Sequence, residues 1–244
     1  FTNAYSACQV CSPSRAALLT GRYADRVGVP GVIRNDPKGS WGWFAPGVPT
    51  LADVLRTRGY HTALIGKWHL GWDWPIAEGK KRLFSSGGDK GKKGLAATDE
   101  QKAAWKETFS KPIPGGPTAV GFDEYFGTDV PNWAPFCFIE NDRTLGIPSE
   151  LLAPSDVGNN QASRQGPALK NWKLEHILPT LSDRAVAFIT DAAQRPEPFL
   201  LYLPLTAPHT PLSPVAEWKG KSGLNTYADF VMQTDATVGC VLDA

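Results

Sequence analysis

The chain of 244 residues contains no apolar run that approaches the length needed to cross a membrane, and it shows no internal repeat. It also lacks an excess of either charge: its formal net charge is +1, which argues against general binding to nucleic acids. Apolar side chains make up 42% of the sequence, enough for a sizeable core in one domain. The composition therefore indicates a globular domain and leaves its chemistry open.

Cysteine is scarce, with four residues in the chain. Cys8 and Cys11 form a C-x-x-C pair, a pattern found in redox sites and in half of a zinc site. The others, Cys137 and Cys240, belong to no second C-x-x-C, so a full set of zinc ligands is not evident. A buried cysteine on a structural helix is a third interpretation of Cys11.

The segment at 11–21, CSPSRAALLTG, is the most informative in the chain. Ser12 is a candidate helix cap, Pro13 suits the first helical position and Gly21 suits a helix end, so the segment predicts a short helix. Arg15 follows Cys11 by about one turn, which places both on the same face. Amide groups at a helix start, together with a guanidinium, favour binding of a tetrahedral anion beside the cysteine.

A second candidate segment follows a short helix predicted from Thr50 to about Arg58. The sequence GYHTALIGKWH at 59–69 predicts a buried strand over 60–65, ended by Gly66. If the chain stays extended, Lys67 and His69 point to the same side. A cation and an imidazole would then share the carboxyl end of a strand, where open α/β sheets bind their ligands.

A third segment combines a buried strand pattern, PFLLYL at 198–203, with the loop TAPHTP at 206–211. The prolines stiffen the loop around His209. A histidine between prolines is by itself most often a turn residue, so His209 gains its interest from the other two segments. His61 and His176 fit no motif and are interpreted as structural or surface residues.

Together the three segments resemble the type I sulfatases of the alkaline phosphatase superfamily. The pattern C-x-P-S-R with a short apolar helix and T-G is similar to the first signature of that family, and G-Y-x-T-x-x-x-G-K-x-H is similar to the second. A strand followed by A-P-H-x-P is a third shared feature. The resemblance implies an α/β fold of the alkaline phosphatase type, with a mainly parallel sheet flanked by helices.

The resemblance also implies a reaction. Cys11 would be oxidised to formylglycine by a formylglycine-generating enzyme, and its hydrate would attack the sulfur of a sulfate ester, giving a covalent sulfate intermediate and then inorganic sulfate. Arg15 would hold the hydrate, and Lys67 would bind the sulfate together with His209. His69 would act as the base, and His209 would protonate the leaving oxygen. Calcium is the implied cofactor, bound by the modified Cys11 and by ligands outside this chain.

Sulfatases normally carry a first strand that ends in paired aspartates and a later strand that ends in Asp-Asn, which bind the metal. Neither is present here, so we interpret residues 1–244 as a partial sulfatase catalytic domain and expect the isolated fragment to be nearly inactive. The alternatives are a phosphonate or phosphate monoester hydrolase of the same superfamily and an inactive truncated homologue. Family analogy implies a periplasmic, extracellular or lysosomal location.

The remaining sequence fits alternating helices and strands. Helices are predicted over 181–194, with Ser182 as cap, and from 226 to about 242. An irregular basic insertion at about 72–121 is interpreted as a solvated loop or as a basic rim that attracts a polyanionic substrate. Within it, Thr98 and Gln101 predict a capping box for a helix to about Phe109. The apolar stripe predicted on the last helix consists of Tyr227, Phe230, Val231, Thr234, Val238 and Val241.

Further candidates for contact with substrate follow the segment GFDEYFG at 121–127, namely Asp129, Asn132 and Trp133. Four tryptophans could stack on sugar rings or pack in the core: Trp41, Trp43, Trp72 and Trp74. These aromatics and the basic insertion favour a sulfated carbohydrate as the substrate.

Overall fold

The computed structural model describes residues 3–34, 44, 46–84, 96–157 and 163–244. The α-helices are α1 (Cys11–Thr20), α2 (Leu51–Arg56), α3 (Asp99–Phe109), α4 (Pro154–Val157), α5 (Ile177–Ala192) and α6 (Thr226–Asp243). The strands are β1 (His61–Lys67), β2 (Glu124–Thr128), β3 (Ile139–Glu140), β4 (Arg143–Thr144), β5 (Glu150–Leu151), β6 (Pro167–Ala168) and β7 (Phe199–Tyr202). Short 3-10 helices cover Ala24–Val27, Lys81–Leu83, Pro117–Val120 and Leu174–His176.

A five-stranded sheet in the order β4-β3-β2-β1-β7 forms the centre of the molecule. β1 runs parallel to both neighbours: Lys67 lies opposite Thr128 of β2, and Leu64 lies opposite Tyr202 of β7. The short strands β3 and β4 extend the sheet in antiparallel fashion, while β5 and β6 pair separately. Because the longer strands are parallel, the residues that follow them gather at one edge of the sheet.

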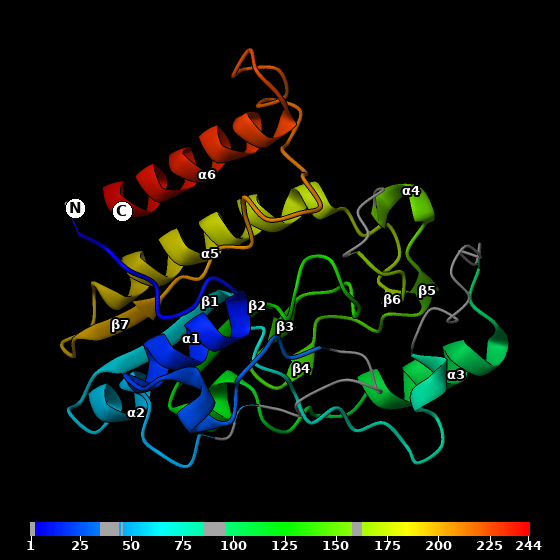
Figure 1. The fold of residues 1–244 in the computed structure, drawn as a ribbon, viewed down its shortest axis with the longest axis horizontal. Coiled ribbons are helices and arrows are strands. Elements are labelled where there is room, and N and C mark those ends of the chain that lie inside the picture. Colours follow the sequence, from blue (N-terminus) through cyan, green and yellow to red (C-terminus); the bar gives the residue numbers. More distant parts are fainter. Residues whose placement is uncertain (1–2, 35–43, 45, 85–95, 158–162) are drawn as a thin grey trace.

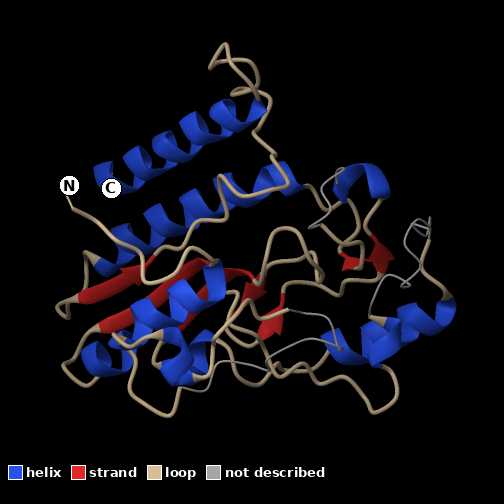
Figure 2. Ribbon diagram, in the orientation of Figure 1, coloured by secondary structure: helices blue, strands red, loops and turns tan. Residues whose placement is uncertain are grey.

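Helices cover both faces of this sheet, as Figures 1 and 2 show. α1 and α2 lie on one face, and α5 lies on the other, with α6 packed on α5 farther from the sheet. Side chains of β1 alternate between the two layers: Leu64 packs in the cluster that includes Leu19 of α1, whereas Ala63 and Ile65 pack with α5. The predicted α/β fold, a mostly parallel sheet flanked by helices, is confirmed.

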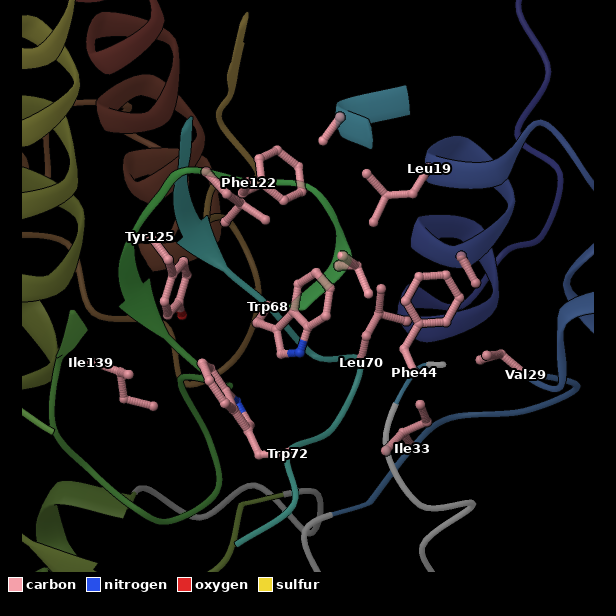
Figure 3. Close-up of a cluster of buried hydrophobic side chains, with 14 of the residues drawn as sticks. Leu19, Val29, Ile33, Phe44, Trp68, Leu70, Trp72, Phe122, Tyr125 and Ile139 are labelled. Atoms are coloured by element: carbon pink, nitrogen blue, oxygen red, sulfur yellow. The ribbon is translucent and has the colours of Figure 1, made fainter. Parts of the chain in front are cut away.

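The hydrophobic cluster on the α1 side anchors the chain just after β1. Trp68 and Leu70 are fully buried in it, and Figure 3 shows Trp68 between Phe122 and Tyr125 on one side and Leu19 on the other. The Trp68 indole N–H donates to the Gly71 carbonyl at 2.8 Å, so its one polar group is satisfied. The segment that carries the two site candidates Lys67 and His69 is therefore held by buried neighbours on alternate positions.

Local sequence signals explain where several helices begin. The capping box predicted at the start of α3 is confirmed: the Gln101 amide donates to Thr98, and the Gln101 side chain accepts from the Thr98 amide. α2 has an equivalent box between Thr50 and Asp53. At the other end of α1, Gly21 has a φ of 64°, so it ends the helix in the left-handed conformation that the sequence predicted for it.

Four predictions of detail are wrong. Gly66 does not end the strand, because β1 continues through it to Lys67, which pairs with Thr128 of β2. Ser12 does not cap α1, because the helix begins at Cys11 and Ser12 lies buried inside its first turn. Ser182 does not cap α5, which begins at Ile177, since Pro179 is tolerated in a first helical turn. The predicted stripe on α6 is only partly buried. Its buried face comprises Asp229, Phe230, Gln233 and Thr237, whereas Tyr227, Val231 and Val238 are exposed.

Much of the described part of the 72–121 region packs against the domain. Trp72 is buried and its ring contacts that of Tyr125 in a tilted arrangement, with the centroids 5.6 Å apart. Trp105 donates its indole N–H to the Leu83 carbonyl at 2.9 Å. Lys80 pairs with Glu107 at 2.7 Å. The Gly- and Lys-rich run at 85–95 lies outside the described residues, so the basic rim stays a prediction. Among the described helices, none has the length and apolar character of a membrane span.

Candidate active site

The N-terminus of α1 carries Cys11 and Arg15. Cys11 is the first helical residue and is partly exposed, and the preceding N-cap residue, Val10, offers no side-chain oxygen to the first-turn amide groups. Arg15 reaches across to the sheet, where its Nη1 donates to the Lys67 carbonyl at 2.6 Å. α1 is thereby tied to the carboxyl end of β1 on the face that presents Cys11.

Two glycines allow the strand ends to approach closely at this edge. A Cβ atom on Gly127 would lie 1.8 Å from the Gly66 carbonyl oxygen, and one on Gly66 would lie 2.3 Å from the Pro204 carbonyl oxygen. Gly66 also has a φ of 140°, which side chains disfavour. With no side chain in the way, the Lys67 amide donates to the Pro204 carbonyl at 2.8 Å. The chain after β7, which carries His209, is thus held beside Lys67.

Lys67 is a buried cation, with 2% of its surface exposed. Burial lowers the pKa of its ammonium from the ordinary 10.5 to about 8; the nearby Cys11 and Asp129 oppose this change and Arg15 adds to it. The side chain stays mostly protonated near neutral pH, at a cost in stability that a bound anion would offset.

Hydrogen bonds fix both the backbone and the ring of His69. Its backbone adopts a φ of 54°, in the left-handed region, and its amide donates to the Asp129 carbonyl at 3.1 Å and to the Asp129 carboxylate at 3.2 Å. The extended geometry assumed from the sequence therefore ends at Lys67, and a turn brings His69 into the site. A non-glycine residue in this conformation stores strain of the kind that gathers at functional sites.

The His69 ring has a defined tautomer. Its Nε2 lies 3.0 Å from the Ile33 carbonyl oxygen, and because a carbonyl only accepts, Nε2 carries the proton. Nδ1 is then a buried lone pair with no partner among the described residues. Burial, followed by the charges of Lys67 and Arg15, lowers the pKa of His69 to about 2. The neutral ring offers an acceptor nitrogen to whatever lies beside Cys11.

Ser12 contributes to this arrangement in a way that the sequence did not reveal. Its hydroxyl accepts the Ile33 amide at 3.1 Å, and the carbonyl of the same residue accepts from His69. The helix that starts with Cys11 is thus linked through Ile33 to the imidazole. No local pattern signals this link, because Ile33 lies in an irregular segment between α1 and α2.

His209 lies in the loop after β7, between cis peptide bonds to Pro208 and Pro211. Its Nδ1 lies 2.6 Å from the Thr210 carbonyl oxygen and therefore carries a proton, which leaves Nε2 for other partners. Partial burial lowers the pKa of His209; Lys67 and Arg15 lower it further, against the effect of the Thr210 carbonyl. The exposed His209 thus lies within the electrostatic reach of both cations, on a loop that the Lys67 amide ties to β1 through the Pro204 carbonyl.

The structure thus brings Arg15, Lys67, His69 and His209 together, with Cys11 one turn before Arg15 on α1. The charges of Lys67 and Arg15 both act on the two imidazoles, and Cys11 and Arg15 act on Lys67. The cations Arg15 and Lys67, together with two imidazoles whose pKa values they help to lower, form an electropositive site at the start of α1. Such a site favours a tetrahedral anion, whose charge would relieve the mutual repulsion.

The other candidates are distributed around this group. Asp129 and Asn132 are buried near it, and the Trp133 ring meets the His69 ring edge-on at a centroid distance of 5.6 Å. Trp72 and Trp74 pack against each other and against the core, whereas Trp41 and Trp43 lie outside the described residues. His61 is at the opposite end of β1, where its Nε2 lies 2.7 Å from the Glu124 carboxylate, and His176 is exposed at the start of α5.

No disulfide links the C-x-x-C pair, since Cys8, Cys11, Cys137 and Cys240 are all free. Within the described ranges, no three His, Cys, Asp or Glu side chains gather as metal ligands. Calcium takes six to eight oxygen ligands, so these residues do not by themselves fit a calcium site. The expected calcium stays a prediction that depends on ligands outside this chain.

Comparison with known proteins assigns a family to this arrangement. A family model described as Sulfatase matches residues 1–244, the whole chain. The chain belongs to the sulfatase family. This sulfatase chain is 28% identical to the N-acetylgalactosamine-6-O-sulfatase of Bacteroides thetaiotaomicron and 31% identical to arylsulfatase A of Bos taurus, over 100% of its length in both cases. It spans 47% and 41% of those two relatives, less than half of each.

Solved structures agree on the fold of the sulfatase chain. A Bacteroides thetaiotaomicron structure, described with the metabolism of multiple glycosaminoglycans, superposes with a TM-score of 0.70 at 26% identity, over 99% of this chain and 50% of that one. The yidJ protein of Bacteroides fragilis gives a TM-score of 0.59 at 19% identity, over 100% of this chain and 50% of that one, a likeness of fold alone.

Proposed function

We propose that the protein containing this chain hydrolyses sulfate monoesters and releases inorganic sulfate, with Cys11 converted to formylglycine as the nucleophile. The proposal is supported by the cluster of Arg15, Lys67, His69 and His209, with Cys11 one turn before Arg15 and acting on Lys67, in a chain that a sulfatase family model matches from end to end. A sulfate ester reacts through a transition state whose charge spreads over the sulfate and leaving oxygens, which suits an electropositive site.

The modified side chain supplies a hydrated aldehyde, whose one hydroxyl can attack sulfur while the other later restores the aldehyde as sulfate leaves. Lys67 and Arg15 flank this position. The Lys67 ammonium binds sulfate oxygens and is desolvated in advance, so its attraction for the anion is little screened by water. Arg15, tied to the Lys67 carbonyl, orients the hydrate.

The two imidazoles divide the proton transfers. His69 accepts the proton of the second hydroxyl on its free Nδ1, since Nε2 is held by Ile33. His209 binds the ester beside Lys67. When the bound anion brings His209 to its imidazolium form, Nδ1–H stays on the Thr210 carbonyl and Nε2–H donates its proton to the leaving oxygen, which leaves the neutral ring. An anion between the cations would raise the pKa of both rings from the values of the empty site, because it cancels the charges that lower them.

A sulfated glycan is the proposed substrate. One relative is named as an N-acetylgalactosamine-6-O-sulfatase, and a similar structure is described with glycosaminoglycan metabolism. A sulfated small molecule is the alternative, consistent with the relation to arylsulfatase A. Calcium as the metal, a formylglycine-generating enzyme as the modifying partner, and a periplasmic, extracellular or lysosomal location belong to the same proposal by family analogy.

The first experiment compares an aryl sulfate, an aryl phosphonate and sulfated glycosaminoglycan fragments as substrates of the full-length protein. We expect sulfate release to exceed phosphonate cleavage, and mass spectrometry of the Cys11 peptide to show an aldehyde. A preference for phosphonate would establish the alternative hydrolase, and a thiol at Cys11 in an active preparation would contradict the nucleophile. We expect the isolated chain to be nearly inactive, and release at the full-length rate would contradict this.

The role of His209 can be tested through the leaving group. In the His209→Ala variant, the loss of kcat should be small for an aryl sulfate and at least about tenfold larger for a sugar sulfate, because poor leaving groups depend most on protonation. His176→Ala, at the exposed start of α5, is the matched control. Equal losses for both ester types would show that His209 does not protonate the leaving oxygen.

A further inference from the structure

Arg34 lies at the border of the active site. The residue before it, Ile33, is buried in the cluster shown in Figure 3; its amide donates to Ser12 at 3.1 Å, and its carbonyl accepts from the His69 ring at 3.0 Å. A packed side chain and two hydrogen bonds thus fix the backbone just before Arg34. The Arg34 side chain is exposed, so the fold holds a solvent-facing guanidinium next to the segment that anchors His69.

The Trp133 ring contacts both Arg34 and His69. The Cζ atom of Arg34 lies 5.7 Å from the centroid of this ring, in a cation–π contact, and the His69 ring meets it edge-on with the centroids 5.6 Å apart. The residue before Trp133 is fixed as well, because Asn132 is buried and its carbonyl accepts the Arg164 amide at 3.0 Å. One half-buried indole therefore links the guanidinium to the imidazole.

The contact with Trp133 leaves the hydrogen-bonding edge of Arg34 available. A cation–π contact uses the face of a guanidinium, whereas its N–H donors lie in the plane and match the oxygens of a carboxylate or a sulfate. Within the part of the chain that the structure describes, no carboxylate pairs with Arg34. Arg15 and Lys67 already supply the cations beside Cys11, so Arg34 adds a further positive charge that a second anion would neutralise.

We propose that Arg34 and Trp133 form a subsite for a second anionic group of the substrate, a carboxylate or a sulfate on the sugar next to the one that carries the reacting ester. The inference deepens the proposed function and rests on it. Because the Trp133 side chain separates Arg34 from His69, the group bound by Arg34 is distinct from the reacting sulfate. The indole offers an aromatic surface to the sugar between the two anions.

The sequence pointed to only one of these two residues. Trp133 was a candidate for contact with substrate, whereas Arg34 follows no motif and lies in an irregular segment between α1 and α2. Its relation to the site appears only where this segment meets the loop after β2, which carries Trp133. Of the sulfated glycans, the subsite favours those with a second negative charge beside the ester.

The test compares matched charged and neutral ligands of the full-length protein. The first probe is a disaccharide of a uronic acid and N-acetylgalactosamine 6-sulfate. The second is the same disaccharide with the uronate carboxylate converted to its methyl ester, and the third is that methyl ester with an added sulfate on the uronic acid. KM is measured where a probe is hydrolysed, per aldehyde at position 11, and Kd is measured by calorimetry where it is not.

For the wild type, KM or Kd should be about tenfold lower for the carboxylate or for the added sulfate than for the neutral methyl ester, the value of a charge-assisted hydrogen bond. Arg34→Gln should reduce this preference to less than about twofold. Arg34→Lys, which keeps the charge and loses the planar fork, should keep part of it. The preference should also fall as the salt concentration rises. The probe with the larger preference identifies the second group as a carboxylate or a sulfate.

The controls separate this subsite from general electrostatics. Arg22→Gln, exposed just after α1, is the matched control and should keep the wild-type preference. Trp133→Phe keeps an aromatic face under the guanidinium and should retain most of the preference, whereas Trp133→Leu should weaken it severalfold. A wild type without the preference, or an Arg34→Gln variant that retains it, would overturn the inference. Failure of the wild type to release sulfate from any ester would instead count against the proposed function.

Discussion

Replacement of Lys67 by methionine should stabilise the protein while it abolishes activity. The lysine is 2% exposed, and burial lowers the pKa of its ammonium from 10.5 to about 8. One pKa unit corresponds to about 1.36 kcal/mol, so the folded state gives up about 3 kcal/mol to keep this group charged below pH 8. Methionine fills a similar volume without that cost.

The pH dependence of this effect has a definite sign. Because the folded-state pKa of Lys67 is lower than the unfolded value, the unfolded chain binds more protons between about pH 8 and 10.5. The stability of the wild type relative to Lys67→Met should therefore rise through this window. The advantage of the variant is largest below pH 8 and disappears near pH 10.5.

Urea denaturation of the full-length wild type and Lys67→Met at pH 7 and at pH 10 measures the stability difference between them and its change with pH. Lys102→Met, on the exposed side of α3, is the control and should change the free energy of unfolding by less than about 0.5 kcal/mol. Inorganic sulfate should stabilise the wild type more than Lys67→Met, because binding to the folded state adds to its stability. A variant less stable than wild type at pH 7, or one with substantial activity, would refute the reasoning.

Further substitutions test the packing and the hydrogen bonds around the site. Gly127→Ala places a methyl group 1.8 Å from a backbone oxygen of β1 and should lower the free energy of unfolding by about 3 kcal/mol or more. The control is Gly239→Ala in α6, where the methyl group meets nothing within 4 Å and should raise the free energy of unfolding by up to about 1 kcal/mol. Equal melting temperatures of the two variants in thermal denaturation would contradict the close approach of β2 to β1. Ser12→Ala leaves the Ile33 amide without its acceptor and should cost about 1–2 kcal/mol. It should also lower kcat severalfold and alter the pH–rate profile, since the carbonyl of the same residue, Ile33, fixes His69. An unchanged profile would show that Ser12 has only a structural role.

Much of the fold and the site could be predicted from the sequence because the signals are local. Capping residues placed the start of α3, short apolar runs typical of buried strands placed β1 and β7, and Gly21 placed the end of α1. The spacing of Cys11 and Arg15 by one helical turn put both on one face. The starts of α1 and α5 were predicted wrongly. Ser12 and Ser182 are typical capping residues, but both helices begin earlier, after residues whose side chains make no capping hydrogen bond.

What the sequence determined by itself is the set of chemical groups and the elements that carry them. The tertiary structure alone decided their states: the tautomer of His69 depends on a carbonyl 36 residues away, and Arg15 is held by a carbonyl 52 residues away. The lowered pKa of Lys67 depends likewise on burial beneath segments distant in the chain. Such contacts have no local periodicity, because they arise where separate elements meet at the edge of the sheet.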